Sequence, residues 1–483
     1  MTSVKARIAA PQFNRLMAHL FPGDRDEHGA VLMIGISHNK NGITLIVRDV
    51  IIAKDGADYV PGKFGYRALT ADFVARTVRR CAQEQLGYLA VHCHHGDNQV
   101  AFSSTDIDSH QRGYPALLDI TNGGPVGALV FAQNAVAGEI WTRKGVFALE
   151  SMEVVGGNRF RLFPSPPKFA LGHGLAQYNR QSLLFGDVGQ TELQKAKIGI
   201  IGLGGAGSLL SEWLAHLGVG EIVGVDFDKV EPTNRPRLVG ATAWDAQEWL
   251  WKRRTPWLRR VGKCLSNYKV HVAKRVALKA NSRCRYTAIV GDITHRHVAE
   301  QLKDADYLFL CADSAQSRLV FNALIHQYLI PGIQVGVKVP VEATTGVVGD
   351  VFSVARPVLP FTGGGCLLCN GLIPPASLQD EASSPDEKKN QRYVADDAVQ
   401  APSVITLNAL ACAQAANDFL FSFLGLQNAS AVAGYLMHFA RERRWRTVQC
   451  GANAICLHCG IVPNSSYAKG DRADLPCRNC DAS

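Results

Sequence analysis

The stretch KIGIIGLGGAGSLLSEWLAHLGVGEIVGVDFD, residues 197–228, decides the fold of the second half of this chain. Its β-branched run 198–201 predicts a strand that enters a glycine-rich loop, and the loop opens an amphipathic helix. The run 221–225 predicts a second strand, which delivers Asp226 and Asp228 about twenty residues after the glycines. Backbone N–H groups of such a loop approach a phosphate closely, and an acid at the second strand tip can hold ribose hydroxyls. We therefore expect a nucleotide-binding α/β fold whose phosphate loop contains Gly202, Gly204, Gly205 and Gly207.

The residues downstream of this stretch distinguish ATP from NAD as the nucleotide. Asn234 and Arg237 follow the acidic strand end, Lys269 begins a helix-like run, and Asp313 lies in the run CADSAQSR. An NAD enzyme has no use for an Asn and an Arg three residues apart at this point. An enzyme that binds ATP can use both residues. Arg237, together with Lys269, can neutralise phosphate charge, and Asn234 can hydrogen-bond a phosphate oxygen. Asp313 is suited to holding Mg²⁺. A dehydrogenase with coincidental charges is the alternative.

This set of residues resembles the ThiF/MoeB/HesA superfamily of adenylating enzymes, which is related to the ubiquitin-activating enzymes. The resemblance covers Gln177 to about Cys459 and implies a Rossmann-like domain with a mixed sheet. It implies a homodimer in which Arg180 reaches the phosphates of the partner subunit. It also implies a small β-grasp, ubiquitin-like partner ending in Gly, whose C-terminal carboxylate attacks the α-phosphate of ATP. The positions that match the family's Mg-ATP-binding residues are Asp226, Asn234, Arg237, Lys269 and Asp313.

A second candidate site lies in the first part of the chain. The run 86–91 predicts a buried strand that ends in His92-Cys93-His94, and alternation along a strand points both histidines the same way. The following run to Asp106 opens a predicted helix. Two histidines and one carboxylate are suitable ligands for a catalytic zinc, which keeps its fourth position for water.

This pattern resembles the JAMM/MPN-type (JAB) metalloproteases, which cleave after ubiquitin-like proteins. The resemblance assigns Glu27 as the general base, with Asp26 as a neighbouring candidate, and Ser103 as the residue that stabilises the oxyanion. Two features depart from the family: the gap before Ser103 is one residue longer than the commonest spacing, and His95 stands where proline is usual. The alternative is a metal-free domain of this fold that binds a ubiquitin-like partner as a scaffold. The matching zinc ligands are His92, His94 and Asp106.

Length and composition predict how these parts are organised. The chain has 483 residues, of which 47% are hydrophobic, so two or three domains with packed cores are expected. The proline-rich break at 164–167 divides a JAB/MPN-like α+β domain, 1–165, from a ThiF-like domain, 166–483. An acidic protein partner or a phosphate site explains the net charge of +9 more simply than nucleic acid does. No apolar run reaches membrane-spanning length, and thirteen cysteines without a signal peptide indicate a reducing compartment, the cytoplasm.

Six cysteines form three CxxC pairs, and two such pairs complete a closed structural zinc site. In ThiF/MoeB-like proteins one pair lies before the crossover loop and its mate lies near the C-terminus. This arrangement would join Cys366 and Cys369 to Cys456 and Cys459. The rival pairing is a zinc ribbon made by the last two pairs, the second of which is 477/480.

The crossover loop is predicted at about 373–400, and the span 370–411 contains no cysteine. Cys412 follows in a run of small residues typical of a packed helix, where a thiol is a poor nucleophile. We therefore expect that no crossover-loop thioester forms. The adenylate then passes to the thiol of a partner, such as a conjugating enzyme, or to a tail cysteine, or the reaction stops at the adenylate.

Together the two resemblances imply a fused enzyme of a prokaryotic ubiquitin-like conjugation system. Its ThiF-like part activates the modifier, and its JAB-like part processes the precursor or removes conjugates. The main alternative is the activation of a sulfur carrier protein for the synthesis of a cofactor or a thiolated metabolite.

Overall fold

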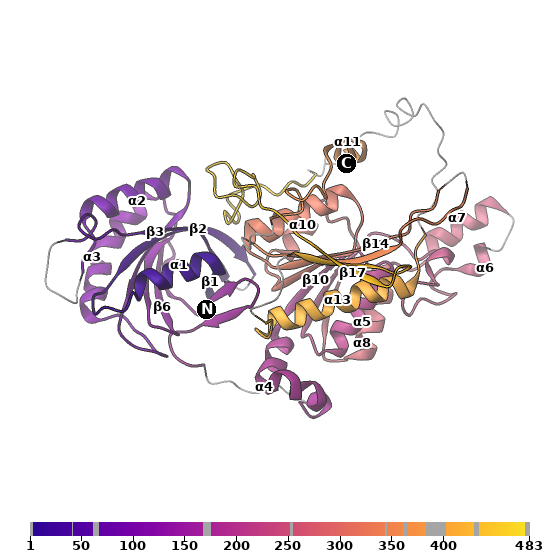
Figure 1. The fold of residues 1–483 in the computed structure, drawn as a ribbon, viewed down its shortest axis with the longest axis horizontal. Coiled ribbons are helices and arrows are strands. Elements are labelled where there is room, and N and C mark those ends of the chain that lie inside the picture. Colours follow the sequence, from indigo (N-terminus) through magenta and orange to yellow (C-terminus); the bar gives the residue numbers. More distant parts are fainter. Residues whose placement is uncertain are drawn as a thin grey trace.

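The computed structural model describes residues 3–40, 42–60, 67–167, 175–251, 255–342, 345–360, 365–382, 402–428 and 434–478. Two mixed α/β units lie side by side, and each is built on its own sheet (Figure 1).

The first unit is a nine-stranded sheet in the order β7-β6-β5-β4-β2-β3-β1-β8-β9. Alternation along β2 sends Leu32 into the core under helix α1 and Val31 into the core under helices α2 and α3. The helices are α1 (Ala10–Leu20), α2 (Ala71–Gln83) and α3 (Ser104–Ile120). The strands are β1 (Ser3–Ala9), β2 (Gly29–Asn39), β3 (Gly42–Ile52), β4 (Gly87–Cys93), β5 (Val126–Phe131), β6 (Val136–Thr142), β7 (Gly145–Ala148), β8 (Ser151–Val155) and β9 (Phe160–Leu162).

The second unit is an eight-stranded mixed sheet in the order β12-β11-β10-β13-β14-β15-β16-β17. The first five strands in this order are parallel, and the remaining pairs are antiparallel. The strands are β10 (Lys197–Ile201), β11 (Glu221–Val225), β12 (Arg285–Ile289), β13 (Tyr307–Leu310), β14 (Gly332–Lys338), β15 (Phe352–Val358), β16 (Tyr435–Phe439) and β17 (Arg444–Val448).

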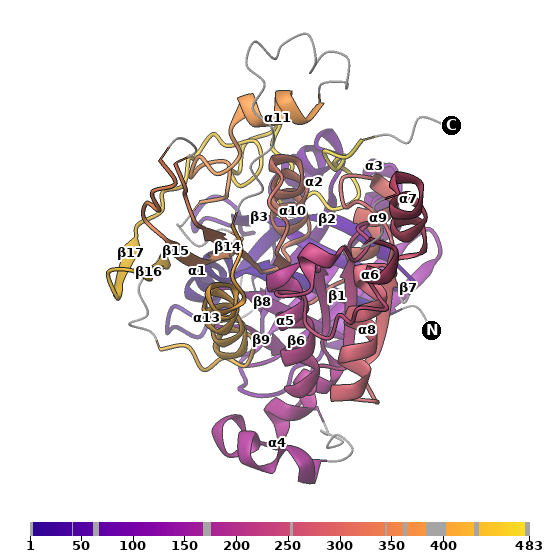
Figure 2. The ribbon, with the colours of Figure 1, turned by 90° about the vertical axis from the view of Figure 1, so that its right-hand side faces the viewer.

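Helices cover both faces of this second sheet, and α4 projects away from the body (Figure 2). One face packs against α5 (Gly205–His216), α8 (Lys269–Ala280) and α13 (Ile405–Phe423). The other face packs against α9 (Arg296–Ala299) and α10 (Ala315–Tyr328). The remaining helices are α4 (Asn179–Lys195), α6 (Glu248–Trp251), α7 (Pro256–Leu265) and α11 (Pro375–Ala382), with short 3-10 turns η1 (Leu175–Tyr178), η2 (Pro232–Asn234) and η3 (Glu300–Leu302).

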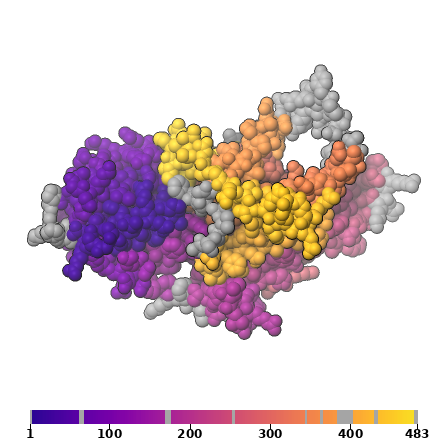
Figure 3. Space-filling model, viewed as in Figure 1, coloured from indigo at the N-terminus to yellow at the C-terminus, as the bar shows by residue number. Residues whose placement is uncertain are grey.

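The C-terminal segment lies against the first unit (Figure 3). The guanidinium of Arg48, almost fully buried, donates to the carbonyl of Tyr467 and, at 2.7 Å, to that of Val462. The N–H of Asp471 donates to the carbonyl of Ile36 at 2.6 Å. These polar contacts fix the C-terminal segment against the first sheet, and each of them satisfies a backbone group that the interface removes from water.

Several local predictions agree with the structure. The strand predicted at 221–225 is β11, the strand predicted from residue 198 is β10, and the glycine loop opens α5 as expected. Cys412 lies in α13 with no exposed surface, which confirms that it belongs to a packed helix.

One prediction needs correction. The loop predicted at 373–400 begins with a helix, α11, and the rest of that loop, 383–400, lies outside the described residues. A tryptophan-rich segment between Arg237 and Lys269 forms the helices α6 and α7. Its side chains Trp244, Trp249 and Trp257 are 75%, 52% and 62% exposed. Within the described ranges, no helix is both long enough and apolar enough to cross a membrane.

Candidate functional site

A cleft of about 440 Å³ opens where the parallel strands β10, β11, β13 and β14 end. Its floor is the glycine loop between β10 and α5. Gly202 has a φ of 86°, which favours glycine, and a Cβ on Gly207 would lie 1.9 Å from the carbonyl oxygen of Gly202. The loop therefore folds this tightly only with glycine at these positions. It presents the N-terminus of α5, which is suited to an anion, to the cleft.

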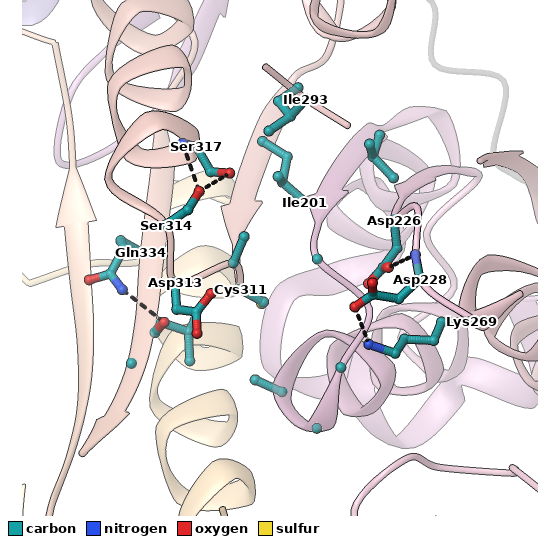
Figure 4. Close-up of a pocket in the computed structure, with 18 of the residues that line it drawn as sticks. Ile201, Asp226, Asp228, Lys269, Ile293, Cys311, Asp313, Ser314, Ser317 and Gln334 are labelled. Carbon is teal, nitrogen blue, oxygen red and sulfur yellow. Dashed lines mark hydrogen bonds and ion pairs between the residues drawn. The ribbon is translucent and has the colours of Figure 1, made fainter. Parts of the chain in front are cut away.

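One wall of the cleft carries two carboxylates and a lysine (Figure 4). The carboxylate of Asp226 accepts the N–H groups of Leu203 and Asp228, both at 2.7 Å. Burial raises the pKa of Asp226, although the nearby Lys269 and these N–H groups favour its charged form. The ammonium of Lys269 lies 2.6 Å from Oδ2 of Asp228. The positive charge of Lys269 is therefore paired within the protein.

The opposite wall comes from the end of β13 and the start of α10. Asp313 is exposed and stands across the cleft from Lys269 (Figure 4). Ser314 caps α10 and accepts the N–H of Ser317 at 3.1 Å. An exposed carboxylate at the edge of this cleft is the kind of oxygen ligand that Mg²⁺ prefers.

The structure brings together most, but not all, of the residues predicted for the nucleotide site. Arg237 lines the cleft and donates to the carbonyl oxygen of Thr233 at 3.1 Å. Asn234 does not line it, and its Oδ1 accepts the N–H of Glu231 at 3.2 Å. Arg180 is exposed on α4, outside the cleft. Lining residues that were predicted are Gly202, Gly204, Gly205, Asp226, Asp228, Arg237, Lys269 and Asp313.

Asn408 on α13 is a cleft residue that sequence analysis missed. It is 5% exposed, and a Cβ on Gly205 would lie 2.3 Å from its Nδ2. Its amide also donates to Ser403, another residue of the cleft, at 3.2 Å. The signal that could have found it is a single amide among the small apolar residues that begin this helix. These contacts tie the residues that follow the crossover loop to the phosphate loop.

The predicted metal ligands of the first unit converge at the end of β4 and the start of α3. Nε2 of His92 lies 3.2 Å from Nε2 of His94, and Oδ2 of Asp106 lies 3.6 Å and 3.5 Å from these atoms. Two ligand atoms 2.0–2.1 Å from a tetrahedral zinc stand about 3.3 Å apart. The three atoms therefore fit one zinc ion and leave a fourth position open.

Neighbouring groups set the orientation of the His94 ring and the charge of Asp106 in a way that suits metal binding. The carbonyl oxygen of Ala101 lies 3.1 Å from Nδ1 of His94, which leaves Nε2 of that ring for the metal. Burial raises the pKa of Asp106, but hydrogen bonds from His92 and Ser103 outweigh this effect and hold the pKa well below its usual value. The carboxylate is therefore ionised at neutral pH.

The two further residues predicted for this site lie beside the ligands. Oε1 of Glu27 is 3.9 Å from Nε2 of His94, and the glutamate is partly exposed. The hydroxyl of Ser103 donates to Asp106 at 2.7 Å and accepts the N–H of the same residue at 3.2 Å. Ser103 is thus the N-cap of α3 as well as a neighbour of the site.

The four cysteines of the first two CxxC pairs form one cluster. The Sγ atoms of Cys366 and Cys369 lie 3.6 Å apart, and Cys456 and Cys459 lie 3.7 Å and 3.6 Å from them respectively. Thiolates 2.3 Å from a tetrahedral zinc stand about 3.8 Å apart, so this cluster fits a closed Cys₄ zinc site. Of the rival pair, Cys477 packs elsewhere, against the core that contains α10, and Cys480 lies outside the described residues.

Most cysteine thiols of the second unit are protected. Burial raises the pKa of Cys412 well above its usual value, and its Sγ donates to the carbonyl of Ala206 at 3.3 Å. Burial also raises the pKa of Cys477, to about 11. Among the cysteines in the described ranges, Cys264 on α7 is the exposed one.

Comparisons with known proteins agree with the fold of the second unit. The profile of the ThiF family matches residues 178–457. The chain is 29% identical over 215 residues to the sulfur carrier protein ThiS adenylyltransferase of Bacillus subtilis, a match that covers 42% of this chain and 56% of that relative. It is 30% identical over 211 residues to the adenylyltransferase and sulfurtransferase uba4 of Emericella nidulans, which covers 42% of this chain and 38% of the relative. The chain thus spans little more than half of one relative and well under half of the other.

Two solved structures are similar to part of the chain. The crystal structure of E. coli MccB with ATP has a TM-score of 0.41 and 22% identity, over 59% of this chain and 74% of MccB. The crystal structure of PaaA has a TM-score of 0.42 and 18% identity, over 60% of this chain and 77% of PaaA.

Proposed function

The chain belongs to the ThiF family, whose profile covers residues 178–457, and we propose from this that its second unit uses Mg-ATP to adenylate the C-terminus of a small ubiquitin-like protein ending in glycine. The observation that carries the proposal is the cleft at the strand ends. There a glycine loop, the cations Arg237 and Lys269 and the carboxylate of Asp313 surround one space large enough for a nucleotide.

The proposed reaction joins the modifier to AMP. An oxygen of the terminal glycine carboxylate forms a bond to the α-phosphorus, the bond from that phosphorus to the β-bridging oxygen breaks, and pyrophosphate leaves with the electron pair. Arg237 and Lys269 would stabilise the charge that develops on the phosphates. Asp313 would hold Mg²⁺, which neutralises phosphate charge when it is bound. The pairing of Lys269 with Asp228 keeps the lysine in the cleft before the nucleotide arrives.

A sulfur carrier protein is the second candidate substrate. The names of two relatives, a ThiS adenylyltransferase and an adenylyltransferase and sulfurtransferase, favour it. Both candidates end in a carboxylate and need the same adenylation chemistry, so they differ only in the fate of the adenylate. The buried Cys412 favours acceptance of the acyl group by the thiol of a partner, such as a conjugating enzyme.

We infer that the active species is a homodimer. Arg180 is exposed on the projecting helix α4, close to Leu183 and Leu184, which are 84% and 58% exposed. If a second copy covered these leucines, Arg180 of the first copy would lie near the cleft of the second copy. A mixture of Arg180→Ala and Asp313→Ala proteins should then recover part of the activity, because one hybrid site holds both intact residues. Sedimentation that detects only monomer at micromolar concentration would contradict the dimer.

For the first unit we propose a JAB-like zinc hydrolase that trims the modifier precursor or removes conjugates. His92, His94 and Asp106 would hold zinc, which supplies Lewis-acid chemistry when it is bound. Glu27 would take a proton from the attacking water and return it to the leaving amine. Ser103 would turn its hydroxyl from Asp106 toward the oxyanion. If the unit were a scaffold instead, it would bind the modifier and cleave no extension.

Exchange of labelled pyrophosphate into ATP tests the adenylation directly. We expect exchange that depends on the modifier and that falls at least about a hundredfold in Asp313→Ala. The matched control is Asp72→Ala, which removes an exposed aspartate of α2, far from the cleft in sequence and fold. Full exchange by Asp313→Ala with every modifier tested would refute the Mg²⁺ assignment.

A further inference from the structure

The loop that carries Glu27 is attached to the metal-bearing strand by the residues that alternate with the metal ligands. This loop, 21–28, joins α1 to β2 and has no regular secondary structure. Cys93 lies between the two ligand histidines and His95 follows them. The side chains of Cys93 and His95 both contact the loop, whereas those of His92 and His94 face Asp106.

Cys93 joins the two ends of the loop. Its Sγ accepts the N–H of His28 at 3.3 Å, and the same thiol donates to the carbonyl oxygen of Leu20 at 3.1 Å. Cys93 is 2% exposed, so water does not compete for either of these hydrogen bonds. A buried thiol that makes two hydrogen bonds in this way fixes where the loop leaves α1 and where it enters β2.

His95 holds the middle of the same loop. Its Nε2 lies 2.9 Å from the carbonyl oxygen of Arg25, two residues before Glu27. His95 itself is exposed, so this bond is made at the rim of the site and not in the core. Proline, the usual residue at this position in the family that the unit resembles, has no side-chain donor and could not make this bond.

We propose that Cys93 and His95 are positioning residues that clamp the 21–28 loop onto β4 and thereby hold Glu27 beside the metal ligands. The inference rests on the hydrolytic function proposed for the first unit. The glutamate must stay within proton-transfer reach of one water, and a displacement of about 1 Å is enough to reduce a rate strongly. Three hydrogen bonds at the start, middle and end of the loop provide this restraint.

Hydrogen exchange of backbone amides in the full-length protein tests the clamp without any substrate. In Cys93→Ala and in His95→Ala we expect exchange in the peptide covering 21–28 to rise about tenfold. Zinc content should remain at the wild-type value, because neither residue is a ligand. Cys93→Ser and His95→Gln keep a donor at each position and should restore most of the protection.

The control variant is Cys81→Ala, which removes another fully buried thiol of the same unit, on α2. It should leave exchange in the 21–28 peptide unchanged. An equal rise in this control, or unchanged exchange in both clamp variants, would overturn the proposal. Since His95 is exposed, its variant is expected to fold even if Cys93→Ala does not.

Cleavage of a modifier carrying a C-terminal extension gives the second measurement. In the clamp variants we expect kcat to fall about tenfold with KM unchanged, since the loop acts on Glu27 and not on substrate binding. A rise in KM with unchanged kcat would contradict the positioning role. Wild-type protein that cleaves no extension would refute the proposed hydrolysis, whereas the exchange experiment would still decide whether the clamp exists.

Discussion

The two candidate sites of this chain are prepared for their ligands in opposite ways. In the first unit the atoms of His92, His94 and Asp106 converge to within 3.2–3.6 Å of one another, at the spacing that zinc requires. In the cleft of the second unit Lys269 is paired with another side chain of the protein, Asp228, at 2.6 Å. The proposed metal site is therefore preassembled, whereas in the proposed nucleotide site Lys269 would exchange Asp228 for a phosphate.

This difference follows from the elements that build each site. A strand end and a capped helix start fix the three metal ligands, so their geometry is set by the backbone. The lysine of the cleft is a long, flexible side chain at the start of α8, and its counter-ion keeps it in place until a stronger anion arrives. We therefore expect substitutions in the two sites to affect ligand binding and reaction rate differently.

The largest effect is expected in the preassembled site. Glu27→Ala should lower the cleavage of a C-terminally extended modifier by about a hundredfold to ten-thousandfold, because it removes a general base. Its zinc content should stay unchanged, since Glu27 is not among the three converging ligands. His92→Ala provides the contrast and should lose both zinc and activity. A Glu27→Ala protein that lost its zinc would show that the glutamate is a ligand.

In the cleft, Lys269→Ala should reduce pyrophosphate exchange about a hundredfold, because it removes charge stabilisation that is needed as pyrophosphate leaves. Asp228→Asn should reduce pyrophosphate exchange by less than about tenfold. Lys269 keeps its charge in this variant and loses only its partner within the protein. Both variants are compared in the same exchange assay. If Asp228→Asn lowered pyrophosphate exchange more than Lys269→Ala does, the carboxylate of Asp228 would be the group that acts in the reaction, and Lys269 would only position it.

The cysteine cluster offers a third arrangement, one that is preassembled and closed. Cys456→Ser should remove one zinc per chain and lower the melting temperature by about 5 °C or more, because structural zinc contributes directly to folding. Cys477→Ser should leave the zinc content unchanged, since Cys477 lies apart from the four clustered thiols. Loss of zinc in Cys477→Ser instead would support the ribbon formed by the last two pairs.

The smallest effect is expected at the buried thiol of α13. Cys412→Ala should leave pyrophosphate exchange within about twofold of wild type and cost about 1 kcal/mol of stability, as is usual for a core substitution. Non-reducing gels with ATP and modifier show whether any thioester is lost in this variant. A thioester that disappears only in Cys412→Ala, with exchange intact, would make this helix the transfer site.

The sequence predicted local elements of the nucleotide fold well because their signals are local. The run 221–225 forms β11, and the glycine loop opens α5, because β-branched residues and glycines act over a few positions. The side chains of His92 and His94 also lie together as predicted, while their role as zinc ligands stays a prediction. The helix at the start of the 373–400 segment was missed, because its polar composition is equally typical of a loop.

Features that depend on distant contacts could not be predicted. Asn408 reaches the phosphate loop from the other end of the domain, and its amide, although visible in the sequence, does not indicate which residues it contacts. The contact of Arg48 with the C-terminal segment joins residues more than 400 positions apart. Trp244 and Trp257 are likewise exposed, although aromatic composition alone predicts burial.

Mass spectrometry of the modifier after incubation with ATP and the full-length protein tests the central claim, which is that the second unit activates a C-terminal carboxylate. We expect the modifier to gain the mass of one AMP at its terminal glycine, with release of pyrophosphate, and we expect no adduct when that carboxylate is amidated. Hydrolysis of ATP to ADP without an adduct, or an adduct that survives amidation, would contradict the account.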